Sequence, residues 1–374
     1  MEKFKRSAAC VFMLAAVPFA SCTFFEIVRH NFSGIEDYKI FPKRELKASA
    51  SPFRFRESLD AAPVPTRVSY GNEREVLLEN MLQASGTVAF LMIKNDTVLC
   101  ERYYEGHADS SLSLSFSMAK SFLSMLIGCA IDDGYIASVE QAVTDYVPEL
   151  QRNGFASVKI KHLLQMTSGM DYVESDNPFA LHPRFYYGND LEKRLLHLKT
   201  KEKPGRRFVY KSGDNQLLGL ILARALKTKN ITAYMQEKIW EPLGMEQRGL
   251  WSIDHEGEGL EKTFCCVSAC ARDVAKLGRL YLNLGNWNGK QIVSRAWVER
   301  STASDTSEGS AWNYQYQWWI VSHERGDYMA AGHLGQFLYV HPRRGCIIVR
   351  LGKSKGSLTT KEWQEVFANL SERI

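Results

Sequence analysis

Runs of apolar residues divide the chain into strand-like and helix-like blocks. The stretches 87–93 and 98–104 are rich in β-branched and aromatic residues, and a polar turn sequence at 94–97 separates them. This arrangement predicts a β-hairpin. The apolar run 121–130 follows, and its length and its ending in Asp-Asp-Gly predict a helix over about 117–134.

The middle of the chain has mostly helical apolar spacing with polar loops, from about residue 135 to about residue 300. The clearest predicted helices cover residues 140–146, 161–166, 215–226, 232–239 and 269–284.

The carboxyl-terminal part returns to strand-like runs joined by short turns and then ends in a predicted helix over 361–370. Strands at both ends, with helices between them, imply an α/β (α+β) fold. One antiparallel sheet is built from both termini, and an all-helical lobe of about 135–300 is inserted and packs against it. A site at the junction would take residues from both lobes. The predicted late strands cover residues 318–321, 328–331, 336–340 and 346–350.

The amino terminus has the layout of an export signal, because residues 1–6 are basic and residues 7–25 carry no charge. Two outcomes stay open. Residues 19–22 (FASC) resemble a bacterial lipobox, in which Cys22 is lipidated, although phenylalanine replaces the usual leucine. Alternatively, the apolar run remains as a membrane anchor, since its length is near the minimum for crossing a bilayer. Both outcomes place the rest of the chain outside the cytoplasm and attach it to a membrane.

The chain therefore divides into three predicted parts. Residues 1–22 form a signal peptide or anchor, and residues 23–69 form an extension and linker that includes the Pro-rich stretch 61–65. Residues 70–374 form the main domain.

Composition excludes several function classes. The 374 residues are 45% hydrophobic and 24% charged, which is typical of a globular protein. The net charge of +5 comes from scattered basic residues, so no nucleic-acid footprint is present. We expect no metal, because the spacing of the cysteines beyond residue 22 matches no metal motif. Most of them are expected to be small buried hydrophobic residues, although some pairing stays open outside the cytoplasm: Cys100, Cys129, Cys265, Cys266, Cys270 and Cys346.

Ser117 and Lys120 are the only pair in which a serine stands three residues before a lysine. On a helix these positions share one face, so the hydroxyl and the amine can touch. A lysine in apolar surroundings loses affinity for its proton and can activate the serine as a nucleophile. The first turn of a helix also offers backbone N–H groups to a developing oxyanion. The alternative is a helix start with a solvated lysine.

An acyl-transfer serine also needs a group that passes a proton to the leaving group, and a tyrosine two residues before Ser or Asn suits this role. Tyr210 and Ser212 lie on a loop between a short extended stretch and a helix, where a side chain can be aimed. Tyr187 remains an alternative. Tyr281 lies mid-helix and Tyr70 precedes the first strand, so both are expected to be structural.

The third expected part is a polar residue and a glycine beside the serine. His333 and Gly335 lie between two predicted strands, and a glycine there permits close approach of the backbone. His255 has the same spacing to Gly257 but falls in a polar loop.

Taken together, these three motifs resemble those of the serine β-lactamase-related family, which includes penicillin-binding proteins, class C β-lactamases, esterases and 6-aminohexanoate-oligomer hydrolases. The stretches between them also resemble the family, in the expected order from about residue 70 to 370. Residues 162–170 (HLLQMTSGM), 241–245 (EPLGM) and 271–278 (ARDVAKLG) are similar to its LLTHTSG, PLGM and DLARFG stretches.

The resemblance implies a β-lactamase/DD-peptidase-like fold with the serine at the junction of its two lobes. It implies that Ser117 is acylated, that Lys120 is its base, and that Tyr210 carries the proton to the leaving group. It also implies an oxyanion hole made by the backbone N–H groups of Ser117 and Gln336. No metal or organic cofactor is implied.

Two positions depart from the β-lactamase pattern. His333 stands where those enzymes have the lysine of Lys-Thr-Gly, and Ser212 stands where class C enzymes have asparagine. Since that lysine helps to hold the β-lactam carboxylate, the departures favour an ester, small amide or peptide-like substrate. The alternatives are a peptidoglycan DD-carboxypeptidase or β-lactamase and, from another class, a non-catalytic cell-envelope binding protein.

Overall fold

The computed structural model describes residues 26–374, except 28, 31, 58–63, 72–74, 176, 178, 228 and 229. The predicted export signal with Cys22, and the first part of the Pro-rich stretch, lie outside these residues. Within the described part, every helix is too short or too polar to span a membrane.

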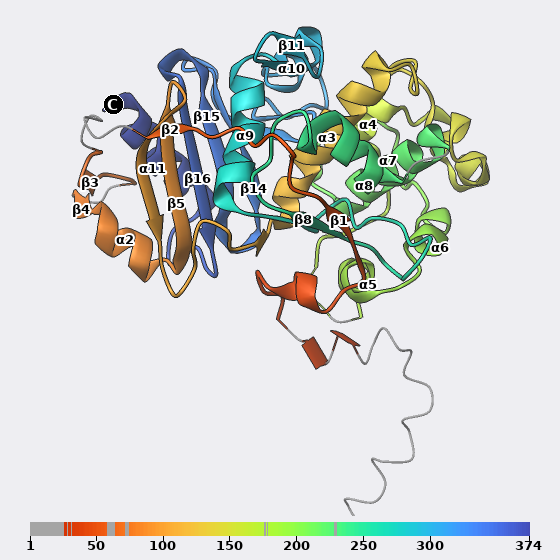
Figure 1. Cartoon of the computed structure of the whole chain (residues 1–374). Helices are drawn as coiled ribbons and strands as arrows, with labels where there is room; N and C mark the ends of the chain where they lie inside the picture. The colour runs from red at the N-terminus through yellow and green to blue at the C-terminus, as the bar shows by residue number, and fades with distance from the viewer. Residues whose placement is uncertain are drawn as a thin grey trace, which may run out of the picture.

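An eight-stranded sheet forms one side of the molecule, and it is built from both ends of the chain as the sequence predicts (Figure 1). The predicted hairpin is confirmed, and its first strand pairs with the last strand of the chain. All neighbours are antiparallel except β2 and β6. In spatial order the strands are β12 (Tyr314–Gln315), β13 (Trp318–Ser322), β14 (Asp327–Gly332), β15 (Gln336–His341), β16 (Cys346–Gly352), β5 (Thr87–Lys94), β6 (Thr97–Tyr103) and β2 (Arg56–Glu57).

Both faces of this sheet are buried, so its central strands are apolar at nearly every position. Phe90 and Met92 of β5 face a core shared with α2 (Leu78–Ala84) and α11 (Thr360–Glu372). Leu91 and Ile93, one residue along, join the larger core that contains α9 (Ala271–Leu282). The period of two thus places different helices on opposite faces.

A second lobe of mostly short helices lies beside the sheet (Figure 1). The helices predicted over 161–166, 215–226, 232–239 and 269–284 are confirmed with shifted ends, whereas α5, α6 and α10 were not predicted. The described helices of this part are α3 (Ala119–Asp132), α4 (Ile160–Leu164), α5 (Leu181–Tyr187), α6 (Leu191–Leu196), α7 (Ser212–Leu226), α8 (Ile231–Met235), a π-helical turn (Gln236–Trp240) and α10 (Arg295–Ser301).

The helix predicted over 140–146 is wrong, because only a 3-10 turn, Val143–Asp145, forms there. Its backbone is used differently: Val143 N donates to Val158 O, and Ala142 forms a β-bridge with Lys159. Pairing with a distant segment therefore replaces helical hydrogen bonds at this point.

The lobe between residues 135 and 300 was expected to be all-helical, but this prediction is wrong because the lobe also contains strands. It contributes two strands to a four-stranded sheet whose order is β1 (Lys43–Leu46), β8 (Gly249–Ser252), β9 (Val267–Ala269) and β7 (Ser113–Leu114). β8 and β9 are buried at every position, so they lack the apolar–polar alternation that identifies a strand in a sequence. Two further strand pairs are β3 (Arg67–Val68) with β4 (Val76–Leu77), and β10 (Asn286–Trp287) with β11 (Lys290–Gln291).

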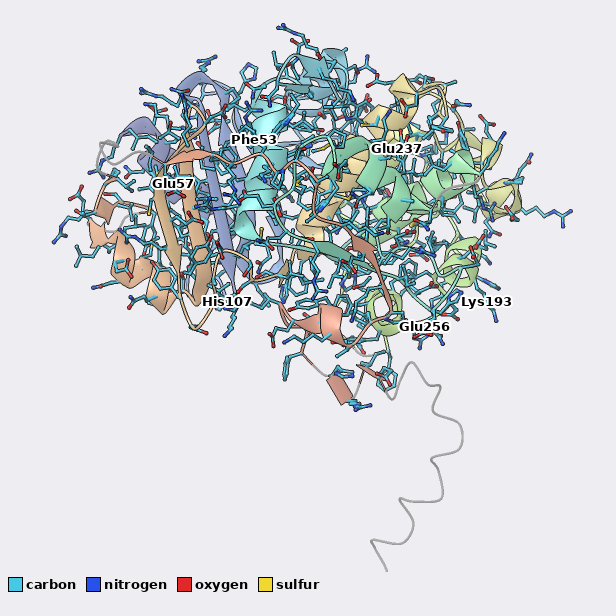
Figure 2. All side chains as sticks on the ribbon, in the orientation of Figure 1. Phe53, Glu57, His107, Lys193, Glu237 and Glu256 are labelled. Carbon is cyan, nitrogen blue, oxygen red and sulfur yellow. A yellow bond between two sulfur atoms is a disulfide. The ribbon has the colours of Figure 1, made fainter. Side chains whose placement is uncertain are left out.

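The segment 32–57 runs across both lobes. β1 adds to the four-stranded sheet, and β2 adds to the edge of the large sheet. Between these strands Phe53, labelled in Figure 2, packs edge-on against Trp287 with 4.9 Å between ring centroids. The segment therefore links the two lobes on one side of the molecule.

Candidate active site

Ser117, the predicted nucleophile, lies in a short 3-10 turn, η3 (Phe116–Met118), directly before α3. Phe116 has a φ of 46°, a left-handed backbone conformation that is costly for an aromatic residue. β14 comes close to this turn, since a Cβ on Gly332 would lie 2.3 Å from the carbonyl oxygen of Ser115. The strained turn and the adjacent strand hold Ser117 where the sheet meets the helical lobe.

Lys120 contacts the Ser117 hydroxyl, as the spacing in the sequence predicts. Its Nζ lies 2.9 Å from Ser117 Oγ, and its side chain is buried, with the residue 1% exposed. Burial lowers the pKa of Lys120 to about 8, while the negative charge of Glu174 acts in the opposite direction. A lysine in this state is a far better proton acceptor near neutral pH than a solvated one.

Tyr210 is the third side chain of a set that includes Ser117 and Lys120. Lys120 Nζ lies 5.0 Å from the centroid of the Tyr210 ring, and that ring stacks on Trp319 with 5.7 Å between centroids. Burial raises the pKa of Tyr210 above its usual range, and its interaction with Ser117 opposes this effect. The phenol is therefore protonated at neutral pH and stands beside the nucleophile.

The other tyrosine candidates have different surroundings. The hydroxyl of Tyr187 donates to His30 O at 3.3 Å, and its ring stacks with His30. Tyr281 is fully buried against Trp318, with 4.4 Å between ring centroids, in agreement with a structural role. His255 is exposed and contacts Asp254.

The predicted third motif forms the turn η8 (His333–Gly335) between β14 and β15. The His333 ring meets the Phe116 ring edge-on at 5.4 Å, so the turn adjoins the nucleophile. Gly335 has a φ of 80°, and a Cβ there would lie 2.0 Å from Arg350 Nη1. A glycine is thus required by both the backbone and the close neighbour.

Gln336 and Ser212 are both buried at this junction. The Gln336 amide is held to β16, since Nε2 donates to Gly352 O at 2.6 Å. The Ser212 hydroxyl has no hydrogen-bond partner among the described residues. A buried hydroxyl without a partner is costly unless a ligand or water supplies one, which suits a substrate-facing position.

Glu174 is a charged residue at the site that the sequence did not predict. Its carboxylate accepts a hydrogen bond from the backbone N–H of Ser212 and lies 3.0 Å from His182 Nδ1. Burial raises the pKa of Glu174, but His182 and the charge of Lys120 outweigh this effect and hold the pKa at about 2. It comes from an irregular loop, where no periodic pattern marks a side chain as functional.

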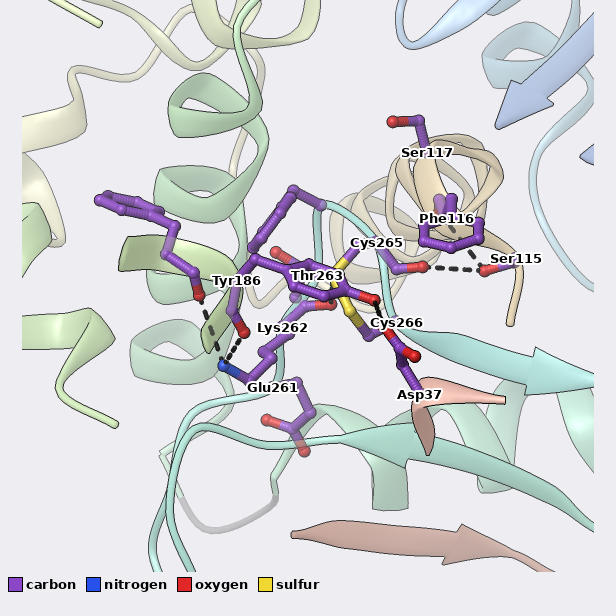
Figure 3. Close-up of a disulfide and its surroundings, with 12 residues drawn as sticks. Asp37, Ser115, Phe116, Ser117, Tyr186, Glu261, Lys262, Thr263, Cys265 and Cys266 are labelled. Atoms are coloured by element: carbon purple, nitrogen blue, oxygen red, sulfur yellow. Dashed lines mark hydrogen bonds between the residues drawn. A yellow bond between two sulfur atoms is a disulfide. The ribbon is translucent and has the colours of Figure 1, made fainter. Parts of the chain in front are cut away.

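A backbone segment of residues 261–266 supports the lysine. Lys120 Nζ donates to Phe264 O at 2.9 Å, and the next two residues, Cys265 and Cys266, form a disulfide beside the nucleophile turn (Figure 3). Ser115 Oγ donates to Cys265 O at 3.1 Å. Spacing in the sequence left cysteine pairing open, and the carbonyl group at Phe264 has no signature in the sequence.

Lys262 is also fully buried but serves the fold. Its Nζ donates to the carbonyl oxygens of Phe185, Tyr186 and Gly188, at the end of α5, as Figure 3 shows for part of this set. The four remaining described cysteines are free and buried, as expected for small hydrophobic residues: Cys100, Cys129, Cys270 and Cys346. Among the residues that the structure describes, no cluster of three or more His, Cys, Asp or Glu residues fits a metal ion.

Comparison with known proteins shows the family of this chain. The family model described as Beta-lactamase matches residues 77–367. A 6-aminohexanoate-dimer hydrolase from Paenarthrobacter ureafaciens is 30% identical over 341 residues, covering 85% of this chain and 85% of that protein.

Solved structures support the fold. A putative 6-aminohexanoate-dimer hydrolase from Bacillus anthracis matches with a TM-score of 0.80 at 24% identity, covering 91% of this chain and 92% of that one. A family VIII carboxylesterase matches with a TM-score of 0.56 at 15% identity, covering 78% of this chain and 96% of that one.

The family match spans most of the chain and includes the turn of Ser117, the loop of Tyr210 and the turn of His333. The related hydrolase extends along a similar share of the chain. The chain belongs to the serine β-lactamase-related family, and it is a serine hydrolase.

Proposed function

We propose that this enzyme cleaves an ester or a linear amide bond through an acyl-enzyme on Ser117. The observation that supports this most directly is the 2.9 Å contact between Lys120 Nζ and Ser117 Oγ in a buried site. With a pKa of about 8, part of the Lys120 population is neutral near neutral pH. The neutral amine accepts the serine proton as the oxygen attacks the substrate carbonyl.

Tyr210 acts as the proton donor to the leaving group. Its raised pKa keeps the phenol protonated, and its position beside both Ser117 and Lys120 suits proton transfer in both directions. After the leaving oxygen or nitrogen takes the phenolic proton, the Lys120 ammonium restores it. Water then attacks the acyl-enzyme, and the same two groups handle its proton.

The oxyanion is stabilised by the backbone N–H groups of Ser117 and Gln336, by analogy with the family. Ser117 lies in the η3 turn, and Gln336 directly follows the η8 turn, which Arg350 binds; fixed positions for both N–H groups would favour stabilisation of charge that develops in the transition state.

An ester or linear amide is preferred over a β-lactam on the evidence of His333. This side chain does not supply the permanent positive charge that a lysine would offer to a β-lactam carboxylate. The relatives also include proteins named as a 6-aminohexanoate-dimer hydrolase and a family VIII carboxylesterase. The second candidate, a β-lactamase or DD-carboxypeptidase, draws support from the match to the family model described as Beta-lactamase.

A fluorophosphonate probe tests the nucleophile, because it modifies activated serines covalently. Wild-type protein should be labelled at Ser117, and the Ser117→Ala variant should not be labelled. Folded wild-type protein that stays unlabelled at every serine would overturn the proposal.

Tyr210→Phe and Lys120→Ala should each lower kcat by about 100-fold or more, as is typical for loss of a general acid or base. Tyr187→Phe is the matched control, because its hydroxyl bonds to His30 O in the free enzyme. If Tyr187→Phe lost activity while Tyr210→Phe kept it, the assignment of the proton donor would be wrong.

A substrate panel separates the two candidate functions. We expect turnover of p-nitrophenyl esters and short linear amides and little hydrolysis of nitrocefin. Efficient nitrocefin hydrolysis, or stable trapping of labelled penicillin on Ser117, would favour the second candidate.

We also propose that the enzyme is exported and attached to a membrane through residues 1–25. Incorporation of labelled palmitate into wild-type protein, and its loss in Cys22→Ser, would support the lipoprotein form. Membrane attachment without palmitate would support the anchor, and protein retained in the cytoplasm would contradict both.

A further inference from the structure

A cavity of about 320 Å³ is lined by Tyr210, whereas Ser117 is not part of its lining. It lies between the loop 169–174 and the segment 201–211. Its lining combines Tyr210 and Glu174 of the catalytic region with a group of cationic side chains: Lys201, Lys203, Arg207 and Lys211.

Two of these four cations are already neutralised by neighbours. Lys201 Nζ lies 2.7 Å from Asp171 Oδ1, and Arg207 binds both carboxylate oxygens of Glu202. Lys203 and Lys211 form no hydrogen bond or ion pair through their ammonium groups with any of the described residues. The cavity therefore contains two ammonium groups without bonded partners, whereas its two carboxylates already have partners: Glu174 binds Ser212 N and His182, and Glu202 binds Arg207.

Lys211 is the more informative of the two because it is 4% exposed. A buried ammonium group without a bonded partner is costly, so such lysines are rare unless a counter-charge is provided. Burial lowers the pKa of Lys211, and the charge of Asp214 opposes this effect. Asp214 Oδ1 accepts from Ser168 Oγ, and Asp214 Oδ2 has no hydrogen-bond donor among the described residues. Burial raises the pKa of Asp214 to about 7, so this carboxyl is a weak counter-ion near neutral pH.

Lys211 is the residue directly before α7, a helix of 15 residues, and the positive end of the helix dipole lies at this point. The Glu174 carboxylate already accepts a hydrogen bond from Ser212 N there, so the ammonium groups are the groups that remain for a ligand. Lys203 is exposed at the rim of the same cavity, where it can meet an incoming anion. One buried and one exposed ammonium group suit a small carboxylate, with the buried group as the anchor.

We infer that this cavity is an anion subsite, in which Lys211 and Lys203 bind a carboxylate on the leaving portion of the substrate. The inference rests on the proposed function, in which Tyr210 protonates the leaving group. Tyr210 both lines the cavity and interacts with Ser117, so the cavity adjoins the side chain that protonates the leaving group. A linear amide with a free carboxyl end has this form: its carbonyl joins Ser117, and its amine leaves with the proton from Tyr210 and with the carboxylate.

A pair of matched esters tests the subsite. The butanoyl ester of 4-hydroxybenzoic acid carries a carboxylate on its leaving group, and the butanoyl ester of methyl 4-hydroxybenzoate does not. Lys211→Met should lower kcat/KM for the acid ester about tenfold more than for the methyl ester, because a buried charge pair is lost. Lys211→Arg should retain most of the preference.

Lys201→Met is the control, since this cation at the same cavity is already paired with Asp171. It should leave the ratio of the two kcat/KM values unchanged. In Lys211→Met, an unchanged ratio of the two kcat/KM values would overturn the inference. If both values fell by the same factor, the role of Lys211 would be structural.

A binding measurement separates this inference from the proposed function. Calorimetric titration of the Ser117→Ala protein should show tighter binding of the acid ester than of the methyl ester, and the Ser117→Ala, Lys211→Met protein should lose that difference. If wild-type protein hydrolyses neither ester but this difference is found, the subsite stands and the proposed function fails. Equal binding of both esters to the Ser117→Ala protein would overturn the subsite.

Discussion

At the residue scale, burial and a neighbouring carboxylate shift the pKa of Lys120, the proposed base, in opposite directions. Burial lowers the pKa of Lys120 to about 8, and Glu174 raises it. Lys120 must be neutral to accept the serine proton, so kcat/KM for a neutral ester should rise with pH and reach half its maximum near pH 8. A half-maximum below pH 6 would contradict the role of Lys120 as the base.

Glu174→Gln removes the charge that raises the Lys120 pKa, and the Lys120 pKa should then fall. The half-maximum of kcat/KM should shift to lower pH by about 0.5 to 1 unit, within the range that one nearby charge produces. Asp171→Asn is the control on the same loop, since Asp171 is exposed and paired with Lys201. A shift to higher pH in Glu174→Gln, or an equal shift in the control, would show that Glu174 does not act on Lys120.

The limits of the sequence are visible at the same scale. Ser117 and Lys120 were predictable because a helix converts a spacing of three into contact. Glu174 was not, because its position depends on the path of an irregular loop. The carbonyl oxygen of Phe264 was not predictable for another reason: every residue has such a group, and only the folded backbone decides which one faces the lysine.

At the element scale, the turn η8 depends on a strand that lies beyond it in the chain. Arg350 of β16 is fully buried, and its guanidinium donates to Leu334 O and Gly335 O of the turn at 3.2 and 2.7 Å. It also donates to Ser85 O and Ser354 O. One side chain thus satisfies four backbone carbonyl groups. It connects the turn before β15, the strand that begins with Gln336, to the end of α2.

Arg350→Met should lower the free energy of unfolding by about 3 kcal/mol or more, because several buried carbonyl groups lose their donors. It should also lower kcat/KM by at least about tenfold at a temperature where the variant stays folded, since misplaced donors weaken oxyanion stabilisation. Urea denaturation and ester hydrolysis measure the two effects. Arg343→Met, at an exposed turn position, should change neither, and similar values for both variants would contradict this role.

Gly335→Ala tests the same turn through the backbone. A Cβ would lie 2.0 Å from Arg350 Nη1, at a φ of 80°. Gly326 is a matched control, because its φ is 70° and a Cβ there meets nothing within 4 Å. Both alanine variants should lose about 1 kcal/mol for the left-handed backbone, but only Gly335→Ala should also lose ester hydrolysis. Equal activities in the two variants would show that the close contact is not important.

Predictability differed among elements for physical reasons. The six longer strands of the large sheet and the helices α7, α9 and α11 carry apolar runs that identify them, whereas the two-residue strands β2 and β12 are too short to give a pattern and were not predicted. β8 and β9 are short and buried on both faces, so their apolar runs could equally belong to helices. The segment 140–146 has helical spacing, but its backbone pairs with residues 158 and 159 instead.

At the scale of the whole molecule, the active site depends on how two lobes are held against each other. The largest core cluster is continuous through both lobes, from β5 and β15 through α3 to α7. On the outside, the segment 32–57 adds β1 to the edge of the four-stranded sheet and β2 to the edge of the eight-stranded sheet (Figure 1). Exposed strand edges invite wrong pairing, so this segment also protects two of them.

Leu46→Ala tests whether this segment stabilises the whole molecule. Leu46 is the last residue of β1, is 0% exposed and belongs to the main core, so its truncation should lower the free energy of unfolding by about 2 to 5 kcal/mol. Glu45→Ala, at the exposed neighbouring position, should cost less than about 0.5 kcal/mol. Urea denaturation followed by both circular dichroism and ester hydrolysis measures the loss. If the two lobes unfold as one unit, both signals should shift together to lower urea in Leu46→Ala. Loss of activity well before loss of helix signal would instead mean that this segment fixes only the junction between the lobes.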